Sequence, residues 1–212
     1  FAPGKSTGTW GTHKIITGLR AGQYVRWFGP LRWNALDQKT NDTYTYTPEF
    51  DTFIRWPNEV RPFLNKVTTV VYDAELDSYY EGLDSSAMPL YFMVESRKIK
   101  PGMKLAKTEM DAKLAKVYEA AGIKANIINS RILTGGDTLT YVTSFMFNSM
   151  AEYKKTQQDN SFRDHYEKIH GAGSWKKHLT TYRAIIQEAP VESELWQYIP
   201  ELSSEEESVQ SE

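Results

Sequence analysis

The chain has 212 residues, a formal net charge of −2 and no cysteine. Its length allows a core buried in one large domain or in two small ones. The near-zero charge argues against the concentrated basic surface that nucleic-acid binding needs, and no run of about 18 apolar residues is available to insert into a membrane. Without cysteine, disulfides, thiolate nucleophiles and thiolate metal ligands are all excluded.

The two ends of the sequence give limited information on where the protein works. Phe1-Ala2-Pro3 resembles the residues that follow the first cleavage point in plastid-targeted precursors of algae with secondary plastids. This resemblance implies a soluble protein processed after export, in an algal plastid, as an alternative to a cytoplasmic one. Residues 201–212 are rich in Ser and Glu, which predicts a disordered acidic tail.

Two stretches of the chain are similar to each other. Residues 14–28 align without a gap with residues 131–145, with six identities: Ile15, Thr17, Gly18, Tyr24, Val25 and Phe28 of the first stretch. A second block aligns Phe50 with Phe162, Phe63 with Trp175, and residues 67–69 with residues 179–181. The two alignments predict an internal duplication.

In the first copy, the residue pattern predicts two strands at residues 15–19 and 24–28, joined by a tight connection. A helix should follow, and then a closing strand at residues 67–74. Acidic residues between positions 73 and 81 lack the spacing of a carboxylate site, so we interpret them as solvated surface.

The second copy predicts six elements, beginning with a strand at residues 91–96 and an amphipathic helix at residues 101–121 that Gly122 caps. Strands at residues 127–134 and 139–146 flank Gly135-Gly136, which favours a hairpin. A helix at residues 148–169, interrupted around residues 159–160, then precedes a closing strand at residues 179–187.

This element order resembles the dimeric α+β barrel superfamily in a tandem duplicated form, in which two ferredoxin-like units pack sheet to sheet. The resemblance implies an α+β fold of ferredoxin-like repeats packed as an α+β barrel. The second copy is complete, and the first lacks its initial strand and helix. The predicted segments are an N-terminal extension (1–11), the first repeat (12–76), a linker (77–89), the second repeat (90–188) and a C-terminal extension (189–212).

The resemblance implies several activities: cofactor-free monooxygenases, haem-binding and haem-degrading enzymes, and small-molecule isomerases. The fold alone does not choose among them. The sequence has no nucleophile elbow, phosphate loop or zinc signature. The cofactor is therefore left open: no motif in the sequence requires one, haem is possible, and the choice depends on individual residues.

His165 and His170 are five residues apart, which on a regular helix separates their side chains by about 140° and argues against a shared metal. Haem binding stays open, because one imidazole from either residue suffices as an axial ligand. An ordinary position at a helix end or on the surface is the alternative.

Several aromatic residues of the second copy fall where a sheet would meet its helices. We predict a pocket there for a small apolar molecule, in which Phe145 and Tyr182 bind the ligand while Tyr141, His165 and His170 are catalytic candidates for proton transfer. A ferredoxin-like core needs large side chains at the same positions, so plain core packing is the competing interpretation.

Arg131 and Arg183 lie on predicted strands, where a buried guanidinium needs a partner or an anionic ligand. We include both as ligand-binding candidates, with exposure at a strand edge as the alternative.

The first hypothesis for function is therefore a small-molecule-binding protein or enzyme that performs cofactor-free oxidative chemistry on an apolar substrate. The second is a non-catalytic assembly protein, a homo-oligomer in which a neighbour completes the first repeat. The third is a haem-binding protein.

Overall fold

The computed structural model describes residues 10–28, 62, 64–83, 88–158 and 161–203. The chain divides into two compact units, one of residues 10–27 and 70–212 and one of residues 1–9 and 28–69. The second unit contributes only Phe28, Pro62 and residues 64–69 to the described set. The helix predicted after the first hairpin lies outside the described residues. The predicted acidic tail does so beyond residue 203, whereas its first residues, Glu201 and Leu202, lie in a 3-10 turn.

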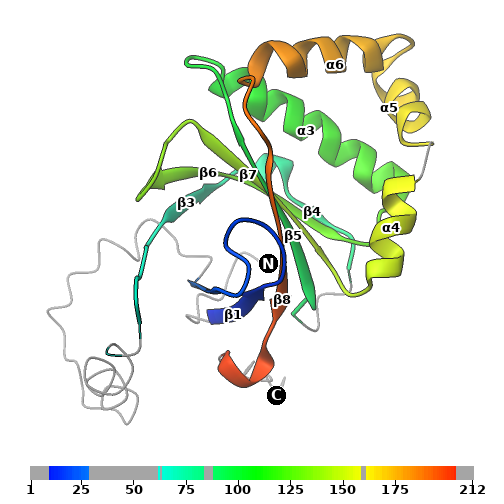
Figure 1. The fold of residues 1–212 in the computed structure, drawn as a ribbon. Coiled ribbons are helices and arrows are strands. Elements are labelled where there is room, and N and C mark those ends of the chain that lie inside the picture. Colours follow the sequence, from blue (N-terminus) through cyan, green and yellow to red (C-terminus); the bar gives the residue numbers. More distant parts are fainter. Residues whose placement is uncertain (1–9, 29–61, 63, 84–87, 159–160, 204–212) are drawn as a thin grey trace, which may run out of the picture. The chain divides into compact units, whose positions relative to one another are not determined.

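The larger unit has an α+β fold (Figure 1). Its strands are β1 (Trp10–Ile15), β2 (Tyr24–Phe28), β3 (Val71–Ala74), β4 (Tyr80–Glu81), β5 (Tyr91–Lys98), β6 (Asn126–Thr134), β7 (Thr140–Phe147) and β8 (Glu192–Tyr198). Its helices are α3 (Lys104–Ala121), α4 (Met150–Gln158), α5 (Phe162–His170) and α6 (Ser174–Ile185), with 3-10 turns η3 (Leu76–Ser78) and η4 (Pro200–Leu202). None of the described helices is both long and apolar enough to cross a membrane.

One curled sheet organises the unit, in the strand order β2-β1-β8-β5-β7-β6-β3, with β4 also pairing with β6. The pairings of β1 with β8, β8 with β5, β5 with β7, β7 with β6, and β6 with β3 and β4 are antiparallel. The sheet curls enough that Arg20, in the connection after β1, acts electrostatically on Tyr72 of β3, near the other end of the strand order.

Most of the second copy follows the sequence-based expectation. β5, α3, β6 and β7 lie within a few residues of their predicted positions, and Gly122 ends α3 in the left-handed conformation with φ 61°. The helix predicted at residues 148–169 is present as two helices, α4 and α5, on either side of the predicted interruption.

The predicted closing strand at residues 179–187 is wrong. These residues lie mostly in α6, which places Tyr182 and Arg183 on a helix instead of a strand. Trp175, His178 and Tyr182 recur at helical spacing and turn toward the rest of the unit, and this periodicity outweighs the β-branched residues between them. The closing strand is β8, within the segment predicted as a C-terminal extension.

The first predicted strand is also displaced. β1 covers residues 10–15, whereas the prediction was 15–19. Gly18 has φ 97° and opens a turn, after which the Gln23 carbonyl accepts a hydrogen bond from the Ile15 N–H at 2.9 Å. The strand predicted at residues 67–74 is confirmed only as the shorter β3.

The sheet has two faces with different neighbours. The helix face packs against α3, α4 and α6, with a core that includes Ile127, Phe147 and Tyr118 (Figure 1). The opposite face, which we call the concave face, holds a second core of Phe92, Val94, Val142 and Met146. Successive residues of a strand alternate between these faces.

His13 lies on the concave face and is completely buried. Its ring meets Phe92 edge to face at 4.3 Å between centroids, and burial lowers its pKa from 6.5 to about 4. The folded protein therefore holds His13 neutral at pH 7.

We predict that acid destabilises the protein through His13. Between pH 6.5 and 4 the unfolded chain protonates this residue and the folded chain does not, so the free energy of unfolding should fall by about 3 kcal/mol over that window. Urea unfolding of wild type and His13→Phe at a series of pH values isolates this contribution. Equal pH slopes for the two proteins would contradict it.

Candidate functional site

Polar side chains form two rows across the helix face of the sheet. Strand register aligns the first row as Arg97, Tyr141, Arg131 and Asp73, from β5, β7, β6 and β3. The second row lies two residues away on each of these chain segments and consists of Glu95, Thr143, Asn129 and Glu75. We call these eight residues the polar belt. Apolar side chains dominate the next row, so the belt is a local departure from a normal core.

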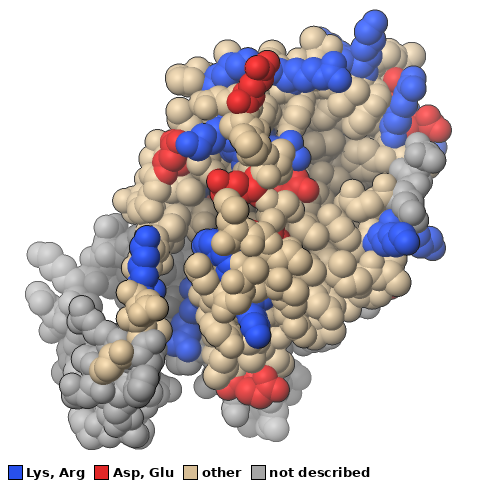
Figure 2. Space-filling view, viewed as in Figure 1, with Lys and Arg blue, Asp and Glu red and all other residues tan. Residues whose placement is uncertain are grey.

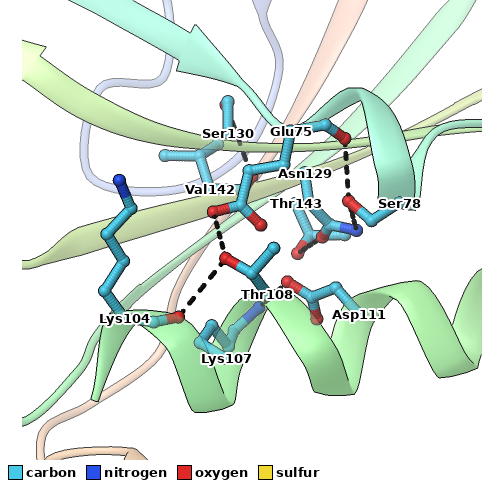
Figure 3. A network of polar contacts seen from close by, with 10 residues as sticks. All are labelled: Glu75, Ser78, Lys104, Lys107, Thr108, Asp111, Asn129, Ser130, Val142 and Thr143. Carbon is cyan, nitrogen blue, oxygen red and sulfur yellow. Dashed lines mark hydrogen bonds and ion pairs between the residues drawn. The ribbon is translucent and has the colours of Figure 1, made fainter.

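Helix α3 covers part of the belt with polar residues of its own (Figure 3). Lys107 and Asp111 are one helical turn apart and form an ion pair, with only 5% and 2% of their surfaces exposed. The Lys107 ammonium also lies 5.2 Å from the centre of the Tyr141 ring. A helix that would otherwise present an apolar stripe thus brings charge to the sheet.

Hydrogen bonds hold the second row in place (Figure 3). Thr108 donates its hydroxyl proton to Glu75 Oε1 at 2.9 Å. Thr143 donates to Asn129 Oδ1 at 2.7 Å, and the Asn129 amide donates to Ser78 Oγ at 3.3 Å. These contacts fix the carboxylate and amide between α3, η3 and the sheet.

Three buried atoms of the belt have no hydrogen-bond partner in the described part of the chain. They are the Tyr141 hydroxyl, Glu75 Oε2 and Arg131 Nε. A terminal nitrogen of Arg131 binds Asp73 at 2.7 Å, so Nε is the free donor of that guanidinium edge. Each unpaired buried polar group costs about 1–3 kcal/mol. These two donors and one acceptor lie in adjacent positions, where a polar atom of a bound ligand would satisfy their hydrogen bonding.

Burial sets the protonation state of the belt. It raises the pKa of Tyr141 to about 12, and the negative charge of Glu75 and the approach of its carboxylate to within hydrogen-bond reach of the phenol add to the shift. The Tyr141 phenol is therefore protonated at neutral pH and available as a donor. Burial also raises the pKa of Asp111, against the opposing effect of Lys107.

The structure brings three of the predicted site residues together. Tyr141 and Arg131 are directly opposed on β7 and β6, and Tyr182 packs in the same apolar cluster as Tyr141, with Arg97 5.5 Å over its ring. Phe145 lies further along β7, in the cluster around Tyr118. Arg183 is exposed on α6 and does not join the belt.

The two predicted histidines lie on α5. His170 packs 4.6 Å from the Tyr166 ring, and its Nε2 is 3.2 Å from the Lys113 carbonyl oxygen. That nitrogen is already engaged, so the surroundings of His170 do not fit a haem ligand. His165 is half-buried.

The surface hollows and the arrangement of metal-binding side chains do not indicate a ligand or metal site at His165 or His170. Two surface hollows lie elsewhere, one between η3, β4 and α3 and one along the start of α6. The described residues hold no group of three or more metal-binding side chains.

Sequence reasoning missed Glu75, Lys107 and Asp111. Glu75 belongs to the acidic stretch that we interpreted as solvated surface, yet its Oε2 is buried. The available signal was the pair Lys107 and Asp111, which interrupts the predicted apolar side of α3 next to Met110.

On the outside of the unit, charges of both signs are interspersed, and Lys and Arg gather along the edge where α6 lies (Figure 2).

We predict that the ion pair contributes little net stability, although breaking it is costly. Lys107→Met leaves the Asp111 carboxylate buried without its partner and should lower the free energy of unfolding by about 3–5 kcal/mol. The double variant Lys107→Met/Asp111→Leu should recover stability to within about 1 kcal/mol of wild type. Denaturant unfolding of the three proteins measures both effects, and a double variant as unstable as the single one would disprove the interpretation.

Comparison with known proteins supports the fold class. No protein-family model matches the chain, and no curated protein is significantly similar to it. A solved structure, described as an anthrone oxidase-like protein, superimposes with a TM-score of 0.51 at 10% sequence identity, covering 91% of this chain and 76% of that one. At this identity the similarity concerns the fold alone. It fits the α+β fold with a curled antiparallel sheet that the larger unit has.

Proposed function

We propose that the chain is a small-molecule-binding protein of the α+β barrel type and that the polar belt is its ligand site. The observation that carries the proposal is the group of unpaired buried atoms: the Tyr141 hydroxyl, Glu75 Oε2 and Arg131 Nε. Ile99, Met110 and Ile185 pack beside Tyr141 and supply an apolar wall. The arrangement suits a mostly apolar molecule with one polar oxygen.

The same atoms suit a cofactor-free oxidation. The substrate is an apolar ketone with an acidic methylene group, of which anthrone is an example. The Glu75 carboxylate takes a proton from the methylene carbon, and the resulting enolate oxygen accepts hydrogen bonds from Tyr141 and Arg131. Dioxygen then oxidises the electron-rich carbon from CH₂ to C=O, and the second oxygen atom leaves as water. The fold shared with an anthrone oxidase-like protein supports this choice of probe.

We also propose that the fold is a tandem duplication with a ferredoxin-like second unit. The order β8-β5-β7-β6 is that of a ferredoxin-like sheet. The pairing of β1 with β8 resembles the pairing of β6 with β3. Ile15 is opposite Trp196 in the first pair, and Ile132, which aligns with Ile15, is opposite Tyr72 in the second. The closing strands β8 and β3 each lead directly into a 3-10 turn, η4 and η3 respectively. Gly18 and Gly135, aligned in sequence, both have positive φ.

An oxygen-electrode assay with anthrone tests the proposed function. Wild type should consume oxygen faster than buffer does. Glu75→Gln removes the base and should slow the reaction by about 100-fold or more, while Tyr141→Phe removes one donor to the enolate and should slow it by about 10- to 100-fold.

Tyr24→Phe is the matched control, because Tyr24 aligns with Tyr141 but is 58% exposed, and its rate should equal that of wild type. Equal rates in all four proteins, or no oxygen uptake above buffer, would contradict the proposed oxidation. If no oxygen uptake above buffer is seen, the ligand site is still supported when anthrone binds to wild type and binds more weakly to Tyr141→Phe. Binding that is absent, or insensitive to that change, would reject the site as well.

A further inference from the structure

His13 occupies an unusual position for an imidazole. It is completely buried on the concave face, and neither ring nitrogen has a hydrogen-bond partner in the described part of the chain. Four aromatic rings of described residues surround it, at centroid distances of 4.3 Å for Phe92, 5.4 Å for Tyr198, 6.2 Å for Trp196 and 6.4 Å for Trp27. We call these five residues the His13 cage.

The cage contains a third unpaired nitrogen, the indole Nε1 of Trp27. A neutral imidazole has one N–H donor and one acceptor nitrogen, and the indole adds a second donor. Leaving all three buried and unpaired is expensive, since each costs about 1–3 kcal/mol. The fold itself does not require these groups, because the aligned positions of the β6–β7 hairpin hold Ser130 and Ser144.

The backbone accommodates the indole specifically. A Cβ atom on Gly11 would lie 2.7 Å from Trp27 Nε1 and 2.9 Å from its Cε2, so only glycine leaves room for the ring in this position. The nearby charges are already paired. Arg20 makes two hydrogen bonds to Glu194, at 2.8 and 2.6 Å, and the Trp196 N–H donates to the same carboxylate at 2.8 Å. A ligand of the cage therefore has no free charge to neutralise.

We propose that the His13 cage is a second binding site, for a neutral planar aromatic molecule bearing a hydroxyl group. Flat aromatic walls suit a planar ring. The hydroxyl can donate to the free imidazole nitrogen and accept from the imidazole or indole N–H. This site lies on the face of the sheet opposite the polar belt and does not depend on the proposed oxidation.

Binding of 1-naphthol and of naphthalene, measured by isothermal titration calorimetry with tryptophan fluorescence as a second signal, tests the proposal. Wild type should bind 1-naphthol about tenfold or more tightly than naphthalene, because one net hydrogen bond contributes about 1.4 kcal/mol. His13→Phe keeps a buried ring but removes both nitrogens, and should abolish this preference. Trp27→Phe should also weaken the preference for 1-naphthol, and this variant takes the place of His13→Phe if the latter fails to fold.

His178→Phe is the matched control, since His178 is another buried histidine among aromatic rings, on α6, and its replacement should leave the preference for 1-naphthol unchanged. The imidazole ¹⁵N resonances of His13 should shift on adding 1-naphthol. Equal affinity for the two compounds in wild type, a preference that survives both cage substitutions, or unmoved ¹⁵N resonances would overturn the proposal.

Discussion

The antiparallel register of β7 between β5 and β6 is the constraint on which the candidate site depends. It sets Tyr141 directly between Arg97 and Arg131, and it sets Thr143 between Glu95 and Asn129. Because strand side chains alternate between faces, all six lie under the helices while their sequence neighbours enter the concave core. A slip of one residue would exchange the two sets and leave Val142 and Met146 against α3.

The two faces of the sheet manage polar groups differently. On the helix face, Lys107 pairs with Asp111 and Thr108 with Glu75, so most charge is compensated and a few atoms stay free. On the concave face, apolar and aromatic side chains predominate, and His13 is neutral among them. Unpaired polar atoms in native cores call for an explanation. The proposed binding of small molecules would account for these two sets but not for Ser174 Oγ and His178 Nδ1 of α6, which are unpaired as well among the described residues.

The sequence predicted β5, α3, β6 and β7 because their signals are local: apolar periodicity, Gly122 after the helix, and Gly135-Gly136 between the strands. It failed at α6, where the alignment of residues 179–181 with residues 67–69 suggested a strand, because packing of Trp175 and His178 against α5 decides the conformation there. Tyr141 and Arg131 could be found as polar residues on strands of a core. Glu75 could not, since its burial depends on α3 crossing a distant segment.

The central claim is that the polar belt binds a ligand oxygen. The most direct measurement is a crystal structure of the protein with anthrone bound. The account predicts the ketone oxygen within about 2.6–3.2 Å of both the Tyr141 hydroxyl and Arg131 Nε, with the methylene carbon toward Glu75. Anthrone bound elsewhere, or bound with its ketone oxygen out of hydrogen-bond reach of the Tyr141 hydroxyl, would contradict it.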